Sequence, residues 1–423
     1  MSWLQIAGLS IFVITYLLII SERLHRLKAS LAGIAGAMFF HVIDQSDAFS
    51  YIDFNTIGLL IGMMIIVAIL RKTGIIQYLA VRAVKLSRGN PWYLLVLLSA
   101  LTAVASAFLD NVTTVLMIGP VAIAVSEVLR ISPVPFILGE IFSANIGGTA
   151  TLIGDPPNLL IGSAADLTFN DFLLNLGPAV LASMAVMFCL LYLWFGKELK
   201  PTDRTREVAK TFREPKIVDD KAFLYRIVGV IALVIGGFAL HGIMGLEAAT
   251  IALSGAALAL IICPVDVEEI IKGVDWVTIL FFSSLFMLVG TLEHLGLIHI
   301  LAEKIFTYFG DRPKMITVLL IWGSGVISAV VDNVPYTAAV IPLVRDFASM
   351  SSAGGEFLWW SLALGACFGG NGTLVGASAN LVMSGIAEKS GIRLTFMSYL
   401  VRGAVVLSGS LAISTIYIFI RYL

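Results

Sequence analysis

Two related polar stretches, one in each half of the chain, interrupt its apolar sequence. Asn145 to Asn158 reads NIGGTATLIGDPPN, and Cys367 to Asn380 reads CFGGNGTLVGASAN. Both carry glycines that break a helix, and hydroxyl and amide side chains that donate and accept hydrogen bonds. Helix ends inside a membrane also present unpaired backbone N–H and C=O groups. This chemistry suits a small polyhydroxylated or anionic solute, or a dehydrated cation held by carbonyls.

Eight side chains of the two stretches are candidate solute ligands. They are Asn145, Thr149, Thr151, Asn158, Asn371, Thr373, Ser378 and Asn380. The alternative interpretation is that they only satisfy the backbone where the helices break. We favour solute binding, because backbone satisfaction alone would not require asparagines.

Two Asp-Asn pairs, Asp110-Asn111 and Asp332-Asn333, interrupt two other apolar runs, with the same separation along the chain as the two stretches. A carboxylate inside a membrane is costly unless water, an ion or a proton compensates its charge. We therefore interpret these pairs, together with Thr113, as ion or proton sites. In the alternative interpretation Asp caps the following helix while Asn adopts a left-handed turn conformation, and both roles can coexist.

Asp155 has no acidic counterpart in the second stretch, where Ala377 takes its place. Residues shared by both copies can serve the scaffold, whereas asymmetric residues can serve the chemistry. Asp155 is therefore the leading candidate for the group that takes and releases protons, followed by Asp110 and Asp332. The three cysteines are too few and too scattered for a thiolate metal site, and we expect neither a metal nor a cofactor.

The chain is 59% hydrophobic and only 13% charged over 423 residues, which indicates a multi-pass membrane protein. We expect an all-α membrane protein built as an inverted repeat of two five-helix units, each with a re-entrant hairpin and a broken transmembrane helix. The first unit covers residues 1–195, a basic cytoplasmic linker covers 196–226, and the second unit covers 227–423. Nothing points to a nucleic-acid partner.

The interrupted run from Pro91 to Leu129 has two interpretations, either two full spans or a hairpin that turns inside the membrane. We prefer the hairpin, because an inverted repeat needs an odd number of crossings in each copy. With both termini periplasmic, all but five of the 27 Lys and Arg residues face the cytoplasm, as the positive-inside rule requires. The five exceptions are Lys304, Arg312, Lys314, Arg345 and Arg421.

The motifs DNVTTVLMIGP and DNVPYTAAVIP, with GGTATLIGDPPN and GGNGTLVGASAN, resemble the ion transporter superfamily. The resemblance is to the group that holds the ArsB-type arsenite permeases, the P protein and the NhaD-type sodium/proton antiporters. It implies a scaffold, a transport region and a substrate site between the hairpin tips and the breaks. Related dicarboxylate carriers have Ser-Asn-Thr motifs at the tips, whereas this chain has Asp110-Asn111-Val112-Thr113 and Asp332-Asn333-Val334-Pro335. The carboxylates favour proton or cation exchange.

Our first hypothesis is a secondary transporter of a prokaryotic inner membrane that exports arsenite or antimonite in exchange for protons. Undissociated arsenite is a small neutral trihydroxide, and we expect no Lys or Arg at either break, which disfavours an anion carrier. The alternative is a sodium/proton antiporter, and an intramembrane aspartyl protease is disfavoured because the Gly-x-Gly-Asp signature is absent. Besides membrane lipid, the resemblance leaves a cytoplasmic ATPase open as a partner, and a homodimer is also left open.

Overall fold

The computed structural model describes residues 2–21, 23–211, 221–309, 312–350 and 355–423, and every regular element in these ranges is an α-helix. The first half holds α1 (Trp3–Ile20), α2 (Arg26–Phe39), α3 (Gln45–Ser50), α4 (Phe54–Lys72), α5 (Ile75–Leu86), α6 (Pro91–Leu109), α7 (Asn111–Leu129), α8 (Val134–Gly148), α9 (Pro156–Ala164) and α10 (Phe169–Phe195). After the linker helix α11 (Asp203–Thr211), the second half holds α12 (Lys221–Met244), α13 (Ala248–Ile262), α14 (Val267–Lys272), α15 (Trp276–His294), α16 (Leu297–Phe309), α17 (Pro313–Ser328), α18 (Asn333–Met350), α19 (Glu356–Gly369), α20 (Ser378–Lys389) and α21 (Phe396–Tyr422). The predicted all-helical fold is confirmed.

The outer surface of the helices is apolar. In the described part of the chain, eight helices are long and apolar enough to cross a membrane by length and composition. Large side chains such as Leu181, Leu193 and Ile420 are 73%, 76% and 81% exposed. Exposed apolar surface on long apolar helices suits lipid tails rather than water. The structure is therefore that of a multi-pass membrane protein.

The two halves share one arrangement of helices. In the register that aligns the two polar stretches, α4 and α15 begin and end at equivalent positions, and so do α3 and α14. Contacts repeat as well, since Ser106 Oγ donates to Ala144 O at 2.6 Å and Ser328 Oγ donates to Ala366 O at 2.7 Å. The predicted unit boundaries and the opposite orientation of the units in a membrane stay predictions.

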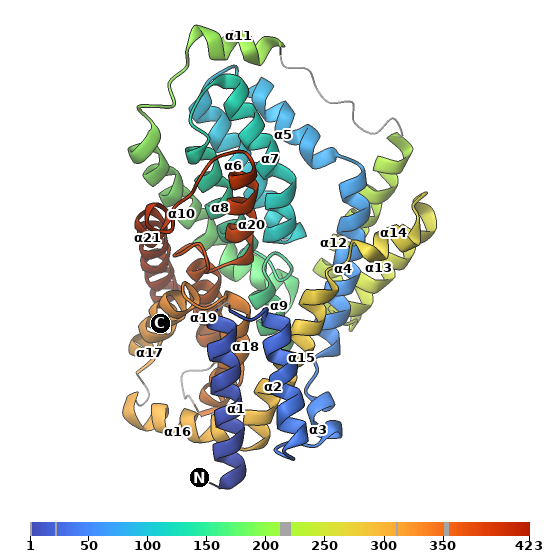
Figure 1. Cartoon of the computed structure of the whole chain (residues 1–423), viewed down its shortest axis with the longest axis vertical. Helices are drawn as coiled ribbons and strands as arrows, with labels where there is room; N and C mark the ends of the chain where they lie inside the picture. Colours follow the sequence, from blue (N-terminus) through green and yellow to red (C-terminus); the bar gives the residue numbers. More distant parts are fainter. Residues whose placement is uncertain (1, 22, 212–220, 310–311, 351–354) are drawn as a thin grey trace.

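The surface helices of the two halves lie at opposite ends of the molecule. Figure 1 shows α5 and α11 toward the upper end and α16, the counterpart of α5, at the lower end near the N-terminus. Two copies of one unit that face opposite sides of a membrane would place these amphipathic helices in this way. The arrangement is therefore compatible with an inverted repeat.

Each half contains one helical hairpin, α6–α7 or α17–α18. A single residue, Asp110, joins α6 to α7, and its φ of 107° lies where residues other than glycine are rare. Asp110 Oδ1 accepts a hydrogen bond from Thr113 N at 2.8 Å and so caps α7. The interpretation that Asn takes the left-handed conformation is wrong, because Asn111 is already the first residue of α7. The two arms are 19 residues each, so their length does not distinguish a re-entrant hairpin from two spans.

Both predicted helix breaks are present, between α8 and α9 and between α19 and α20. The first break depends on close backbone contacts. A Cβ atom added to Gly147 would lie 2.3 Å from Ala103 O of α6, and one added to Gly154 would lie 2.4 Å from Gly148 O. The glycines therefore end α8 and also let the backbones of α6, α8 and the break meet without side chains between them.

The linker helix α11 packs against α5 and α7. Thr205 Oγ1 donates to Gly89 O at 2.6 Å, which ties the linker to the turn between α5 and α6. Residues 212–220, which include Arg213 and Lys216 of the predicted basic linker, lie outside the described residues. Part of the linker is thus a helix held against the first half.

Gly147→Ala should destabilise the protein by roughly 1–3 kcal/mol, because the new methyl group overlaps the α6 backbone. We expect a lower melting temperature and less monodisperse protein in detergent. Gly177→Ala in α10 is the matched control, since an added Cβ there meets nothing within 4 Å. Equal melting temperatures for the two variants would contradict the close α6–α8 contact.

Candidate transport site

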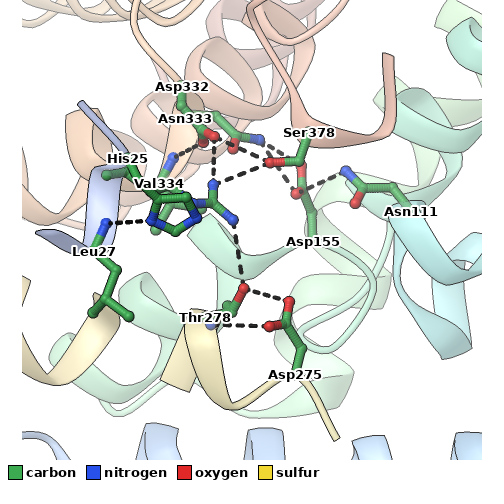
Figure 2. Close-up of polar contacts among 11 residues, drawn as sticks. His25, Leu27, Asn111, Asp155, Asp275, Thr278, Asp332, Asn333, Val334 and Ser378 are labelled. Atoms are coloured by element: carbon green, nitrogen blue, oxygen red, sulfur yellow. Dashed lines mark hydrogen bonds and ion pairs between the residues drawn. The ribbon is translucent and has the colours of Figure 1, made fainter. Parts of the chain in front are cut away.

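A cavity of about 420 Å³ lies where the two hairpin tips meet the helix breaks. Its remaining walls come from α2, α4 and α15. Figure 2 shows that polar side chains from both halves point toward one another here. Half of the predicted site residues line the cavity, namely Asp110, Asn111, Thr113, Asp155, Asp332, Asn333 and Ser378.

Asp155 connects the two hairpin tips. It is fully buried and precedes α9, but its side chain does not cap that helix. Instead, the carboxylate accepts a hydrogen bond from Asn111 Nδ2 at 3.3 Å and two from Asn333 Nδ2 at 3.2 and 3.3 Å (Figure 2). These donors are neutral amides that belong to opposite halves of the chain. A proton gained by Asp155 would therefore weaken contacts to both tips at once.

Three asparagines join the two breaks behind the cavity. Asn145 Nδ2 donates to Asn371 Oδ1 at 3.0 Å and to Asn380 Oδ1 at 2.9 Å. Asn111 Nδ2 lies 3.3 Å from Asn145 Oδ1, which connects this group to the first hairpin tip. Asn371 Nδ2 is buried and has no hydrogen-bond partner among the described residues. A single hydrogen bond therefore connects these three asparagines to Asn111 at the cavity, and the Asn371 amide keeps an unused donor.

The other predicted residues contact backbone carbonyls. The hydroxyls of Thr149, Thr151 and Thr373 each donate to a carbonyl oxygen. Asn158 Nδ2 donates to the carbonyls of Thr149 and Thr151 at 3.0 and 2.9 Å, and Asn380 Nδ2 donates to Thr373 O at 2.8 Å. These contacts match the interpretation that the break satisfies its own backbone, whereas solute binding by these residues stays a prediction.

Arg26 is a cavity residue that the sequence analysis missed. Its guanidinium NH1 lies 3.0 Å from Asp332 Oδ2 and donates to Ser378 Oγ at 3.1 Å. The expectation that no Lys or Arg lies at either break is therefore wrong. Arg26 and Ser378 are 352 residues apart, so no local motif could bring them together. The sequence did contain one indication. The position in the second copy equivalent to Arg26 is Ala248, so the arginine is one of the residues that the repeat does not share.

Asp275 and Thr278 form the wall beside Arg26. Thr278 Oγ1 accepts a hydrogen bond from Arg26 NH2 at 3.4 Å and donates to Asp275 Oδ2 at 2.6 Å (Figure 2). In the sequence this pair was only a marker of the repeat, since Asp53 and Thr56 occupy the equivalent positions of the first half. Its place in the cavity follows from the packing of α15 alone.

Residues 16–365 of the chain match the family described as citrate transporter. The chain belongs to this family. An uncharacterized transporter of Mycobacterium bovis is 39% identical over 99% of both chains. The human P protein is 33% identical over 96% of this chain and 59% of its own length. The kinship with the group that holds the P protein is confirmed, and this member of the citrate transporter family is a membrane transporter.

The fold is also similar to a known structure. The crystal structure of the YdaH transporter from Alcanivorax borkumensis superposes with a TM-score of 0.61 over 99% of this chain and 98% of that one. The sequences are 14% identical, so this likeness concerns the fold alone. The family and its transporter relatives indicate a carrier.

Asn158→Ala should lower the melting temperature, because two buried carbonyls lose their donor at roughly 1–3 kcal/mol each. The half-saturation concentration for solute, measured on the protein that folds, then tests the prediction that Asn158 also binds solute. Ser408→Ala, which removes an exposed hydroxyl from α21, is the control and should leave the melting temperature nearly unchanged. A weakened solute affinity in Asn158→Ala would support the solute-binding prediction, whereas an unchanged affinity would limit Asn158 to the backbone of the break.

Proposed function

We propose that this chain is a secondary active transporter that exports arsenite or antimonite in exchange for protons, with Asp155 as the proton-coupling group. The observation that carries the proposal is the position of the Asp155 carboxylate, fully buried and hydrogen-bonded to both hairpin tips. Protonation changes the acceptor strength of a carboxylate and so changes how firmly both tips are held. Such a group couples proton movement to a change of conformation.

The charges of the cavity favour a neutral or cationic solute. Among the described lining residues, the carboxylates of Asp110, Asp155, Asp275 and Asp332 outnumber the guanidiniums of Arg26 and Arg71. The Arg26 guanidinium is moreover engaged by a carboxylate. A multiply charged anion such as citrate would meet net repulsion here, whereas a neutral trihydroxide can exchange hydrogen bonds with the amides. Asn111 and Asn333, which face the cavity, are the amides we assign to this role.

Sodium/proton antiport is the second candidate, and Asp110 favours it. Asp110 Oδ1 caps α7, and no Lys or Arg pairs with this carboxylate among the described residues, in contrast to its counterpart Asp332. A carboxylate that lines a cavity without a cationic partner can bind Na⁺ or a proton. In a sodium/proton antiporter, Asp110 and Asp155 would together bind the Na⁺ and the protons that are exchanged.

The proposal includes the orientation inferred from charge. The α5 and α11 end of the molecule would face the cytoplasm of a prokaryotic cell and the α16 end the periplasm. The basic linker that contains α11 would then be accessible to a cytoplasmic ATPase, if one takes part. The positive-inside distribution of Lys and Arg supports this orientation, and removing Arg26 from the count leaves the asymmetry intact.

Everted membrane vesicles with an imposed proton gradient test the proposal. We expect gradient-dependent accumulation of arsenite or antimonite, which Asp155→Asn should abolish, because the amide keeps an acceptor oxygen but cannot take a proton. Asp166→Asn is the matched control, since Asp166 is exposed at the end of α9, and it should transport normally. We expect no citrate uptake.

Three results would decide against the arsenite proposal or part of it. Sodium movement without metalloid transport would establish the antiporter alternative. Unchanged pH-driven transport in Asp155→Asn would remove Asp155 from the coupling. Citrate accumulation would contradict the argument from cavity charge.

A further inference from the structure

The Arg26 guanidinium joins three elements from distant parts of the sequence. It contacts Asp332 before α18, Ser378 at the start of α20 and Thr278 in α15, at 3.0, 3.1 and 3.4 Å. Its carbon Cζ also lies 5.1 Å from the centre of the Phe281 ring of α15, a cation–π distance. The Arg26 side chain is 30% exposed and that of Asp332 is 20% exposed, so the pair borders the cavity and is not sealed from it.

The helices that supply and surround Arg26 form a three-helix unit, and its α15 also packs directly against α18 of the second hairpin. α1, α2 and α15 pack against one another, and a separate apolar cluster that includes Ile34, Ala37 and Leu288 holds their lower parts together. The second hairpin tip meets this unit through two polar contacts. One is the Arg26–Asp332 pair, and the other is the hydrogen bond from Tyr16 Oη to Pro335 O at 2.9 Å.

The contact of Arg26 with Asp332 and Ser378, which we call the tie, is present at only one of the two tips. The repeat counterpart of Asp332 is Asp110, but the counterpart of Arg26 is Ala248 and that of Ser378 is Pro156. The repeated fold therefore requires an aspartate at each tip, whereas the arginine is an addition specific to the second tip. An addition that breaks the repeat at the cavity belongs to the transport chemistry rather than to the scaffold.

We propose that Arg26 is a positioning residue of the transport cycle, whose guanidinium acts as a built-in counter-ion that holds the second hairpin tip against α2 and α15. The ion pair occupies Asp332, so that Asp110 and Asp155 remain the groups available to a proton or a cation. The tip can move relative to α2 only when this pair opens. The inference rests on the proposed transport function but not on the identity of the solute.

Several charged groups face this pair. Asp155 lies across the cavity at the start of α9, Asp275 caps α15 beside Thr278, and Arg71 belongs to the α4 wall. Asp110 lines the same cavity from the first tip, and His25 precedes Arg26 in the chain. Removal of Arg26 alone would thus leave Asp332 among three other carboxylates, with Arg71 as the remaining guanidinium in the described lining.

A double-mutant cycle on gradient-driven arsenite and sodium uptake tests the tie. Arg26→Gln should lower the uptake rate by about tenfold or more, because an unpaired charge is left in a confined site. Arg26→Gln combined with Asp332→Asn removes both charges and should recover most of that loss.

Arg402→Gln is the matched control for the cycle. Arg402 lies over an aromatic ring as Arg26 does, 5.4 Å from the centre of Phe195, and it donates to Ser398 O at 3.0 Å. It differs from Arg26 in having no carboxylate partner among the described residues. We expect nearly normal uptake in this variant. Additive losses in the Arg26 and Asp332 variants would overturn the proposal.

Hydrogen exchange of purified protein gives a readout that needs no solute. In Arg26→Gln, amides of the second tip, residues 331–336, should exchange about tenfold faster than in the unmodified chain. Amides of the first tip, residues 109–114, should change by less than about twofold. Unchanged exchange at the second tip would overturn the tie even if transport were lost. Faster exchange, combined with a chain that transports neither arsenite nor sodium, would retain the tie and reject the proposed function.

Discussion

A carboxylate in the interior of a membrane protein must be compensated by the protein, and Asp155 obtains this compensation from amides of both hairpin tips. Asn111 and Asn333 are separated by the whole linker and several helices, yet their side chains converge on one group. Amides stabilise a carboxylate less strongly than a cation does, so the contact remains sensitive to protonation. The meeting of the two halves around the cavity depends on this arrangement.

The helix breaks make that arrangement possible, because they satisfy their own backbone. Carbonyls freed by the end of α8 receive hydrogen bonds from Asn158, and those near the end of α19 receive them from Asn380. Irregular backbone at membrane depth is tolerated only when such partners exist or when it lines a polar cavity. The threonines and asparagines of the breaks therefore keep open a space that polar side chains from the tips can enter.

The repeat separates structural requirements from chemistry. Both copies keep the serine that links the hairpin to the broken span, and both keep an Asp-Asn pair at the tip. Two of the differences between the copies lie at the cavity. Asp155 has Ala377 as its counterpart, and Arg26 has Ala248. A symmetric pair of tips thus surrounds an asymmetric set of charges.

The sequence by itself determined the helical membrane fold, the two copies and the helix breaks, because apolar length and glycine-rich interruptions are local signals. The sequence also singled out Asp155, since its absence from the second copy can be read without a structure. It could not divide the polar residues of the breaks into those that serve the backbone, such as Asn158, and those that reach the cavity.

Only the tertiary structure decided which distant side chains meet. Arg26 reaches the second tip because α2 packs against α15 and brings the start of α2 beside Asp332. In the sequence the same arginine is one of several basic residues between two apolar runs, where it looks like part of a positive loop. Periodicity and charge counts describe each helix separately, whereas an ion pair across 306 residues depends on how the helices pack.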